Sequence, residues 1–463
     1  MKRLMCLLLM LLMPVIALGG EITPEPLVTP HVTPTAEPVD AGDSPVTLRV
    51  AGGGNAAYDG FQRMYPGISI EYTDDSAYTA PEIISALMTR DATYDVMQFN
   101  TSGVDIAKVI DQGYALDLSG SEIIRAYVDS LYPALRDMVS RDGMIYAVPL
   151  HLFSNDGGCY PKNFEALGLA VPTTWQELAE LINAWPEQPD DVLEDYEINE
   201  WTMDYRRWFL RKMTTNYVTH MEATGQELHF DTPLYRELVG LVDAMTTAND
   251  TEEERDVLAL MGNGYIEPFQ QGYTWETPMV DLAIEGRVTH TVEVFLVMVN
   301  PYAEHAEEAM RCIEYMIGRI GPATRQTMVD AAYVTPVENP DYPRLVAEWE
   351  AEKERLEQRL AACAEADRME AQEDVERHEA SWAWIESSRW LVSEESIPAY
   401  AEVFKTLYFP KPSVLDARDE NDPYARSIVE TLQARYLDGQ IDMDAYIREM
   451  ESRMQMVIME RDE

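Results

Sequence analysis

The sequence predicts an α/β protein with two lobes, and three observations support this prediction. Strand-like and helix-like segments alternate from residue 46 onward, as in a sheet covered by helices. About 420 residues follow a proline-rich start, which is enough chain for two hydrophobic cores. Apolar, strand-like segments recur at residues 144–153 and 290–300, and an extended segment follows at 331–342. We expect the chain to cross between the two lobes in these three segments.

The first elements form a βαβ unit. Residues 46–51 alternate in polarity as a strand does, and a glycine-rich turn, a short helix and a Pro-Gly pair lead to a second strand at 68–72. Residues 80–100 repeat the step, with a strand at 95–99, and the next helix ends near Gly113. Strands separated by helices favour a parallel sheet with helices on both faces.

Helices dominate the rest of the chain. Helical patterns occur within residues 204–248 and 306–318, and two amphipathic helices joined at Asp438-Gly439 come last. Residues 344–379 are nearly all helix formers, with apolar residues on one face and charges elsewhere. We expect a long amphipathic segment there, laid on a lobe or paired with a neighbouring helix.

The chain begins with a predicted secretory signal at residues 1–20. Two basic residues precede an apolar run at residues 4–18, and small residues follow, which is the layout of a cleavable export signal. The run is shorter than a membrane-spanning helix requires, and Cys6 lies too early to be the lipidated cysteine of a lipoprotein. Residues 21–44, rich in proline and threonine, are typical of an extended linker. We therefore expect an extracellular or cell-surface protein without a lipid anchor.

The composition excludes several classes of function. With 82 acidic against 35 basic residues, the net charge is −47, which argues against nucleic acid and anionic membranes as partners. The cysteines beyond the signal form no Cys-x-x-Cys pair, so neither a disulfide framework nor a thiolate metal site is expected. His378-Glu379 lacks the second histidine of a zinc helix, and no Gly-x-Ser-x-Gly elbow is present. We expect no catalytic residues, no metal and no cofactor.

One motif points to an enzyme instead. Gly52, Gly54 and Ala57 follow the first strand with the spacing of a dinucleotide-binding loop, and Glu71 lies where a ribose-binding acid would stand. Dinucleotides are scarce outside cells, so an export signal favours the simpler interpretation of a flexible glycine turn. A secreted dinucleotide-dependent enzyme remains an alternative, as does a surface interaction protein that binds a partner through residues 344–379.

Residues 142–182 carry a resemblance to a known family. They contain an Asp-Gly-x-x-Tyr-x-x-Pro strand, a Tyr-x-Lys turn and the helix start Gly-Leu-x-x-Pro-x-Thr-Trp-x-Glu-Leu. This order resembles the segment that crosses between lobes in extracellular solute-binding proteins of family 1, the maltose-binding-protein-like group of ABC importers, although Pro161 replaces the usual Asn. The matching residues are Asp142, Gly143, Tyr146, Pro149, Tyr160, Lys162, Gly168, Leu169, Pro172, Thr174, Trp175, Glu177 and Leu178. We expect Trp175 to be buried, Thr173 or Thr174 to cap the helix and Glu177 to complete a capping box.

The resemblance implies a periplasmic-binding-protein-like type II fold, with two α/β lobes, a ligand cleft between them and an added long helical segment. It implies capture of a small solute by lobe closure and delivery to the transmembrane subunits of an ABC permease. Family ligands are mostly sugars and oligosaccharides, so a carbohydrate is expected, and a polyamine or other cation is the alternative. The expected lobes are residues 45–150 with 295–335 (N-terminal) and 151–294 with 336–463 (C-terminal), residues 344–379 being a helical insertion.

The ligand site is expected at the ends of strands and in nearby loops. Open α/β sheets bind ligands at the carboxyl ends of their strands, and aromatic faces suit the apolar side of sugar rings. From the first lobe we expect Asn55, Tyr58, Tyr72, Asn100 and Thr101 to contact the ligand. From the second lobe we expect His151, Trp201, Tyr273 and Trp275.

Overall fold

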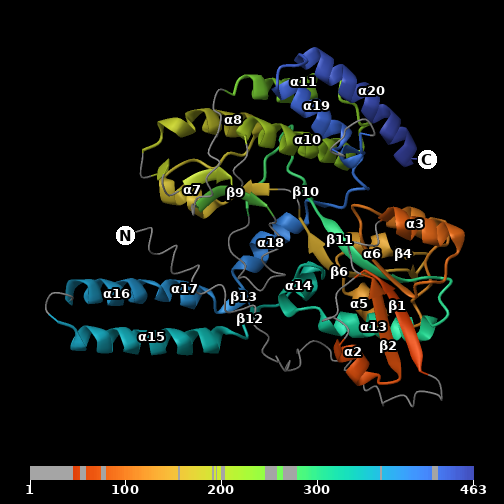
Figure 1. Ribbon diagram of the computed structural model, residues 1–463, viewed down its shortest axis with the longest axis horizontal. Helices are drawn as coiled ribbons and strands as arrows, with labels where there is room; N and C mark the ends of the chain where they lie inside the picture. Colours follow the sequence, from red (N-terminus) through yellow and green to blue (C-terminus); the bar gives the residue numbers. More distant parts are fainter. Residues whose placement is uncertain are drawn as a thin grey trace.

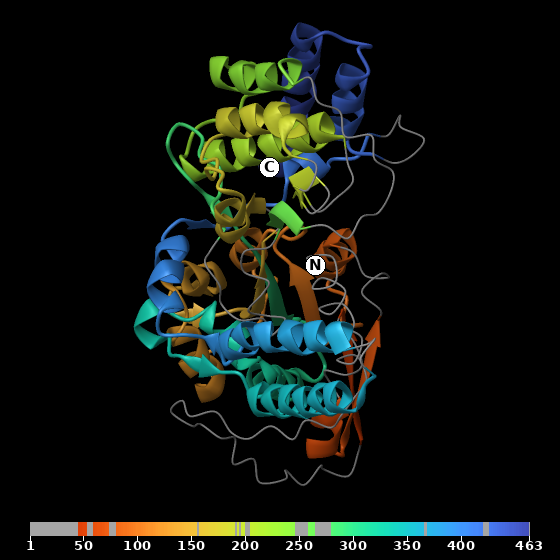
Figure 2. The same cartoon turned by 90° about the vertical axis from the view of Figure 1, so that its left-hand side faces the viewer.

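The structure is a computed structural model in which two lobes lie one above the other (Figures 1 and 2). The predicted signal and linker lie outside the residues it describes. Among the described residues, no helix has both the length and the apolar character of a membrane span. The described residues are 45–52, 59–73, 80–154, 157–189, 192–193, 196–199, 204–245, 258–263, 279–364, 368–419 and 426–462.

A five-stranded sheet forms the centre of the first lobe, in the order β2-β1-β3-β11-β6. β1 is parallel to β2 and β3, whereas β11 is antiparallel to both β3 and β6. The expectation of a purely parallel sheet is therefore wrong for β11, because this strand returns from the second lobe and enters at the edge where β3 and β6 end. The strands are β1 (Val46–Ala51), β2 (Ile68–Thr73), β3 (Val96–Asn100), β6 (Val148–Phe153) and β11 (Glu293–Val299).

Short helices pack around this sheet and share its core. Asp105 caps α4 by accepting hydrogen bonds from the N–H groups of Ala107 and Lys108, and Ser121 caps α5 by accepting from that of Ile124. α13 contacts both β11 and β6, the two strands nearest the second lobe in sequence. The helices are α2 (Asp59–Met64), α3 (Ala80–Thr89), α4 (Ile106–Asp111), α5 (Glu122–Asp129), α6 (Pro133–Val139), α13 (Ala306–Arg319) and α14 (Pro322–Gln326), and a small hairpin of β4 (Ser140–Arg141) and β5 (Met144–Ile145) follows α6.

The second lobe combines a three-stranded sheet, in the order β7-β9-β8, with longer helices. Its core is separate from that of the first lobe and contains large buried aromatic residues from α10 and α11. The strands are β7 (Gly157–Cys159), β8 (Tyr196–Asn199) and β9 (Leu258–Asn263). The helices are α7 (Pro161–Leu167), α8 (Trp175–Ala184), α10 (Tyr205–Ala223), α11 (Pro233–Asp243), α19 (Ile428–Leu437) and α20 (Met443–Asp462).

The segment that carries the family resemblance begins this lobe. Gly168 ends α7 with a φ of 65°, a left-handed conformation that glycine adopts without steric cost. Thr174 then caps α8 by accepting a hydrogen bond from the N–H of Glu177. The Glu177 carboxylate accepts from the N–H of Thr173, one residue before the expected partner of a capping box. Trp175 is buried, as predicted, and its ring meets Phe209 edge-on at 5.1 Å.

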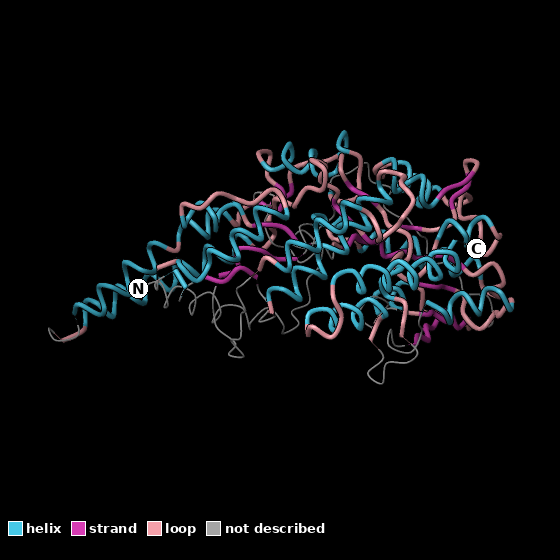
Figure 3. The backbone as a smooth tube through the Cα atoms, turned by 90° about the horizontal axis from the view of Figure 1, so that it is seen from above, coloured by secondary structure: helices cyan, strands magenta, loops and turns pink. Residues whose placement is uncertain are grey.

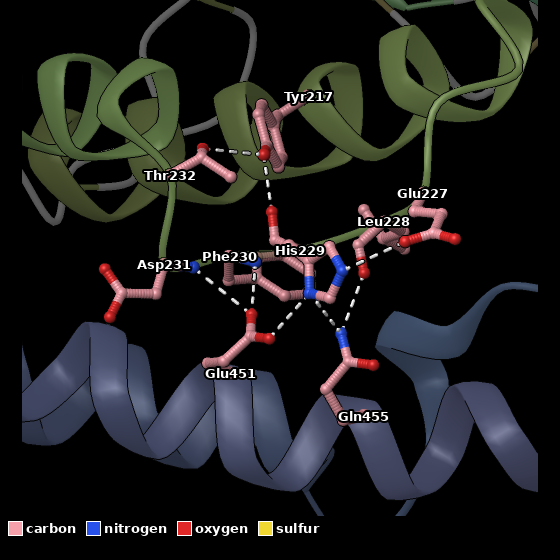
Figure 4. A network of polar contacts seen from close by, with 9 residues as sticks. All are labelled: Tyr217, Glu227, Leu228, His229, Phe230, Asp231, Thr232, Glu451 and Gln455. Carbon is pink, nitrogen blue, oxygen red and sulfur yellow. Dashed lines mark hydrogen bonds and ion pairs between the residues drawn. The ribbon is translucent and has the colours of Figure 1, made fainter.

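A polar network fixes the C-terminal helix α20 to the loop before α11 (Figure 4). One carboxylate oxygen of Glu451 accepts from the N–H of Phe230 at 2.6 Å, and the other lies 2.8 Å from Nδ1 of His229. Gln455 donates to the carbonyl of Leu228 at 2.8 Å. The hydrogen bond to Glu451 raises the pKa of His229, and the carboxylate of Glu227 adds to this effect.

The added helical segment is a hairpin of two helices rather than one long helix. α15 (Tyr342–Ala362) and α16 (Arg368–Ala380) lie side by side and extend away from the lobes (Figures 1 and 3). Two ion pairs between the helices show that they are antiparallel. Lys353 pairs with Glu379, whereas Arg359, later in α15, pairs with Asp374, earlier in α16. The apolar face of α15 runs out at its C-cap, Cys363, where the chain turns back.

The hairpin is attached to the first lobe at its base. β12 (Val337–Glu338) pairs with β13 (Trp390–Val392), and α17 (Trp382–Ser387) and α18 (Ser396–Phe404) follow α16. Leu391, Val392, Tyr400 and Phe404 are buried in the first-lobe core. The ranges expected for each lobe stay a prediction, and this packing associates residues 391–404 with the first lobe.

Candidate functional site

One edge of the first-lobe sheet collects the carboxyl ends of its strands. β3 ends at Asn100 and β6 at Phe153, and β11 begins between them at Glu293. The chain continues from β6 directly into β7 of the second lobe, so this edge faces the crossing. Carboxyl ends of strands are where open α/β sheets bind ligands, because loops from several strands converge there.

Asn100 and His151 both pair with Phe295, so the three residues form one row across this edge. Phe295 of β11 is paired in register with Asn100 of β3 on one side and with His151 of β6 on the other. Residues directly opposite each other in a sheet project from the same face. The His151 ring accordingly stacks on Phe295, with centroids 4.8 Å apart and planes at 23°, and meets Phe153 edge-on at 4.3 Å.

Two polar side-chain atoms at this edge are buried without a hydrogen bond. They are Oδ1 of Asn100, at the end of β3, and Oγ of Ser154, directly after β6. A buried polar atom left unpaired costs about 1–3 kcal/mol, so such atoms are uncommon away from sites that bind a ligand or water. A solute that offers hydroxyl groups to these two atoms would recover that cost.

Thr101 follows Asn100 and holds the edge together. Its Oγ1 accepts a hydrogen bond from the N–H of Val294 at 2.9 Å, and its own N–H donates to the Val294 carbonyl at 3.0 Å. The Thr101 side chain is almost completely buried. Its visible role is to fix β3 against β11, and contact with a ligand stays a prediction.

His151 contributes an apolar, aromatic surface rather than a charge. Burial lowers the pKa of His151 to about 4, so the ring is neutral near pH 7. A neutral ring stacked on Phe295 presents the kind of flat face against which a sugar ring packs. This surface is a physical basis for the predicted role of His151 as a ligand contact.

Tyr72, another predicted site residue, lies away from this row. Tyr72 lies near the end of β2, the outer strand, where it pairs with Val50, which in turn pairs with Val96. It is therefore level with the start of β3 and distant along the sheet from Asn100. Asn55, Tyr58, Trp201, Tyr273 and Trp275 lie outside the described residues.

Ser154 and Phe295 were not among the residues predicted from sequence. Ser154 follows a predicted strand, as Thr101 does, so the carboxyl-end rule used for Asn100 and Thr101 would also have selected it. Phe295 lies within an apolar strand and has no comparable signal, because only the pairing of β11 with β3 and β6 reveals its position.

Metal and thiol chemistry have little support among the described residues. No group of His, Cys, Asp and Glu within them could hold a metal ion. Burial raises the pKa of the Cys312 thiol to about 12 and raises that of Cys159 further, so neither is a ready nucleophile at neutral pH. A pocket of about 390 Å³ lies elsewhere, between α5, α6 and the β4–β5 hairpin, and none of the predicted site residues lines it.

Comparison with known proteins gives consistent results. A family model described as bacterial extracellular solute-binding protein matches residues 51–319. An uncharacterised ABC transporter extracellular-binding protein of Pyrococcus horikoshii is 24% identical over 328 residues, which cover 65% of this chain and 73% of that protein. A solute-binding protein of an ABC transporter from Agrobacterium radiobacter, solved with ribitol, superposes with a TM-score of 0.50 at 13% identity, covering 89% of this chain and 99% of that one. These findings show a two-lobed, type II periplasmic-binding-protein-like fold.

Proposed function

The chain belongs to the bacterial extracellular solute-binding proteins of ABC transporters, and we propose that it captures a polyhydroxylated solute between its lobes and delivers it to a permease. Proteins of this family bind and hand over solutes, so no bond-making step is required of the residues described above. The proposed site is the row of Asn100, Phe295 and His151, with Ser154 beside it.

The unpaired polar atoms of Asn100 and Ser154 are the observation that carries this proposal. Both belong to the strand ends nearest the second lobe, so a solute held there would lie between the lobes. An asparagine amide and a serine hydroxyl each donate and accept hydrogen bonds, and a sugar hydroxyl does the same. Micromolar affinity requires about 8 kcal/mol net, within reach of a few such bonds and a stacked ring.

A sugar, an oligosaccharide or a sugar alcohol is the proposed solute class. The neutral ring of His151, stacked on Phe295, supports this class because sugar rings pack on aromatic faces. The Agrobacterium protein of similar fold was solved with ribitol, a polyol, which makes polyols a natural part of any screen.

A polyamine or another cation is the second candidate. The net charge of −47 favours the approach of cations, and Glu293 begins β11 opposite Phe153, at the same edge as Ser154. A cation would be stabilised there by a carboxylate rather than by hydroxyl pairing.

A thermal-shift screen of the purified protein against sugars, polyols and polyamines tests the proposal. A solute at a hundred times its dissociation constant adds about 2.7 kcal/mol to the free energy of unfolding, which raises the melting temperature measurably. Ser154→Ala should reduce the response, while Ser69→Ala, on the outer strand β2, should leave it intact. Stabilisation by polyamines alone would replace the carbohydrate assignment, and no response from any member would overturn the site.

A further inference from the structure

Two side chains from segments of the second lobe pack in the core of the first lobe. Met279 is only 8% exposed and belongs to the hydrophobic core that the first-lobe strands form. Tyr160 is half-buried and packs against the same core. Tyr160 directly precedes α7, which lies with β9 on the side of the second lobe nearest the first (Figure 1). These two side chains therefore connect the lobes at the base of the second lobe.

The backbone at both residues is fixed to the second-lobe sheet. Val280, which follows Met279, exchanges both backbone hydrogen bonds with Cys159 of β7, at 2.8 and 2.9 Å. The N–H of Tyr160 donates to the carbonyl of Leu260 on β9 at 2.9 Å. Cys159 and Leu260 are fully buried in the second-lobe core. If the second lobe moves as a body, Met279 and Tyr160 move with it, and their packing in the first-lobe core changes.

A pair of glycines makes room for these side chains. Gly158 of β7 lies opposite Gly262 of β9, so side chains at the two positions would project from the same face. A Cβ atom added at Gly262 would overlap the hydroxyl of Tyr160 and lie 2.5 Å from its Cζ. One added at Gly158 would lie 2.9 Å from the Cβ of Met279. Tyr160 and Met279 therefore rest directly on the backbone of the two strands.

Glycine in a strand usually has a specific reason. It weakens the interior of a strand, because it has more backbone freedom to lose and no side chain to pack, and it often marks a close approach. The neighbouring pair in the same two strands, Cys159 with Met261, has buried side chains in the second-lobe core. The feature that the two glycines permit is the close approach of Tyr160 and Met279.

We propose that Tyr160 and Met279, resting on the Gly158–Gly262 pair, form an interlobe contact that sets the ratio between lobe arrangements in the absence of solute. An arrangement that separates the lobes here exposes Met279 to water, at a cost proportional to the apolar area exposed. The contact therefore favours the arrangement of this structure. A solute that requires this arrangement binds more tightly because of the contact, and one that requires another arrangement binds more weakly.

Fluorescence energy transfer between the lobes tests the proposal on the full chain. Dyes are attached at Met88→Cys on α3 and Met456→Cys on α20, both exposed, in a Cys363→Ser background. Cys159 and Cys312 are buried and do not compete for the dyes. The distribution of transfer efficiencies without solute gives the ratio of the arrangement seen here to all others.

Two substitutions should lower this ratio about tenfold. Gly262→Ala overfills the space under Tyr160, a strain that separation of the lobes relieves. Met279→Ala removes apolar contact with the first-lobe core and adds no bulk, so it tests the contact even if Gly262→Ala fails to fold. Met279→Leu, which nearly conserves volume, should stay close to the parent protein. Gly240→Ala, on α11 with no atom near its Cβ position, is the matched glycine control and should leave the ratio unchanged.

A double substitution separates the interlobe contact from a merely structural role. In a Tyr160→Ala background, Gly262→Ala should have little further effect on the ratio, because the ring that it overlaps is absent. Denaturant unfolding of the same variants measures stability independently. Variants that lose stability but keep the parent ratio, or an equal effect of Gly262→Ala with and without Tyr160, would overturn the proposal. The inference rests on the proposed function in that it takes the lobes to move, but failure to find a solute would leave these solute-free results unchanged.

Discussion

The carboxyl edge of the first-lobe sheet and the α15–α16 hairpin differ in whether their polar side chains have partners within the protein. At the edge, Oδ1 of Asn100 and Oγ of Ser154 are buried without partners. In the hairpin, the indole N–H of Trp349 donates to both the His378 carbonyl and the Ser381 hydroxyl. The basic side chains of the hairpin pair with its own acids: Arg344 with Glu348, Lys353 with Glu379, Arg355 with Glu352, and Arg359 and Arg377 with Asp374.

In the hairpin, the polar contacts stabilise the fold. At the sheet edge, the hydrogen bonding of two buried atoms is left incomplete. A two-helix arm has little core, so aromatic stacking and ion pairs between its helices must hold it together. The sheet edge belongs to a large core and is stable without satisfying every polar atom, which leaves hydrogen-bonding capacity for a solute. Substitutions in the hairpin should therefore change stability, and substitutions at the edge should change binding.

The largest effect is expected from Trp349→Ala. Trp349 stacks on His378 at 4.9 Å and contacts Trp382 at 4.7 Å. Because the ring is half-buried, its loss should destabilise the hairpin by about 2–3 kcal/mol, below the 3–5 of a fully buried aromatic. Hydrogen exchange of α15 and α16 measures this, and solute binding should be unchanged. Trp349→Phe, which keeps a stacked ring, should be milder, and unaltered exchange in Trp349→Ala would refute the account of the hairpin.

The second effect is a pH dependence at His151. Its folded pKa of about 4 lies below the unfolded value of about 6.5, so the folded state binds fewer protons. The free energy of unfolding is therefore highest above about pH 6.5, and it decreases as the pH falls toward 4 because the unfolded state binds the proton first. His151→Phe keeps the stack on Phe295 and should reduce the acid-induced loss by on the order of 1–2 kcal/mol. Denaturant unfolding at several pH values measures it, and identical pH profiles would show that the ring is not held neutral.

A change at the edge itself should affect binding more than folding. Asn100→Ala removes a buried atom that has no partner in the protein, and the relief of that cost offsets the packing lost with the side chain, so the free energy of unfolding should change little. Solute affinity should fall about tenfold, which corresponds to about 1.4 kcal/mol and one lost hydrogen bond. Calorimetric titration of the parent protein and the variant with the best solute of the screen compares the two. Equal affinities would remove Asn100 from the site.

The smallest effect is expected at the His229–Glu451 network of the second lobe. The hydrogen bond between His229 and Glu451 raises the pKa of His229 above its unfolded value. The contribution of this contact to the free energy of unfolding is therefore complete below about pH 6.5 and is lost as the pH rises through the folded pKa. The His229 side chain is 44% exposed, which limits the gain to about 0.5 kcal/mol. His229→Gln should lower stability at pH 6 and have less effect at pH 9. A larger loss at pH 9 would contradict the sign.

Local features of the sequence predicted local features of the structure. Trp175 was expected to be buried at the start of a capped helix, and it is, because the capping residues and the tryptophan lie within a few positions of each other. Asn100 was chosen at the end of a first-lobe strand, and His151, on a crossing strand, was assigned to the second lobe. The structure places both in the first-lobe sheet and in one row, so the lobe expected for His151 is wrong. Whether they touch a solute stays a prediction.

Features that depend on distant segments were not predictable. The antiparallel direction of β11 follows from its return from the second lobe, and no residue within the strand specifies it. The helical segment divides into two helices after Cys363. The chain turns back there because α16 covers the apolar face of α15, as the stacking of His378 on Trp349 shows. The approach of Glu285 to His220 likewise joins two segments that only the folded lobe brings together.

Small-angle scattering with and without the most stabilising solute tests the central claim most directly. If the solute bridges Asn100 and Ser154 of the first lobe and groups of the second, the radius of gyration should decrease at saturation. Asn100→Ala should require about ten times more solute for the same decrease. A solute that binds tightly yet leaves the radius of gyration unchanged would contradict capture between the lobes.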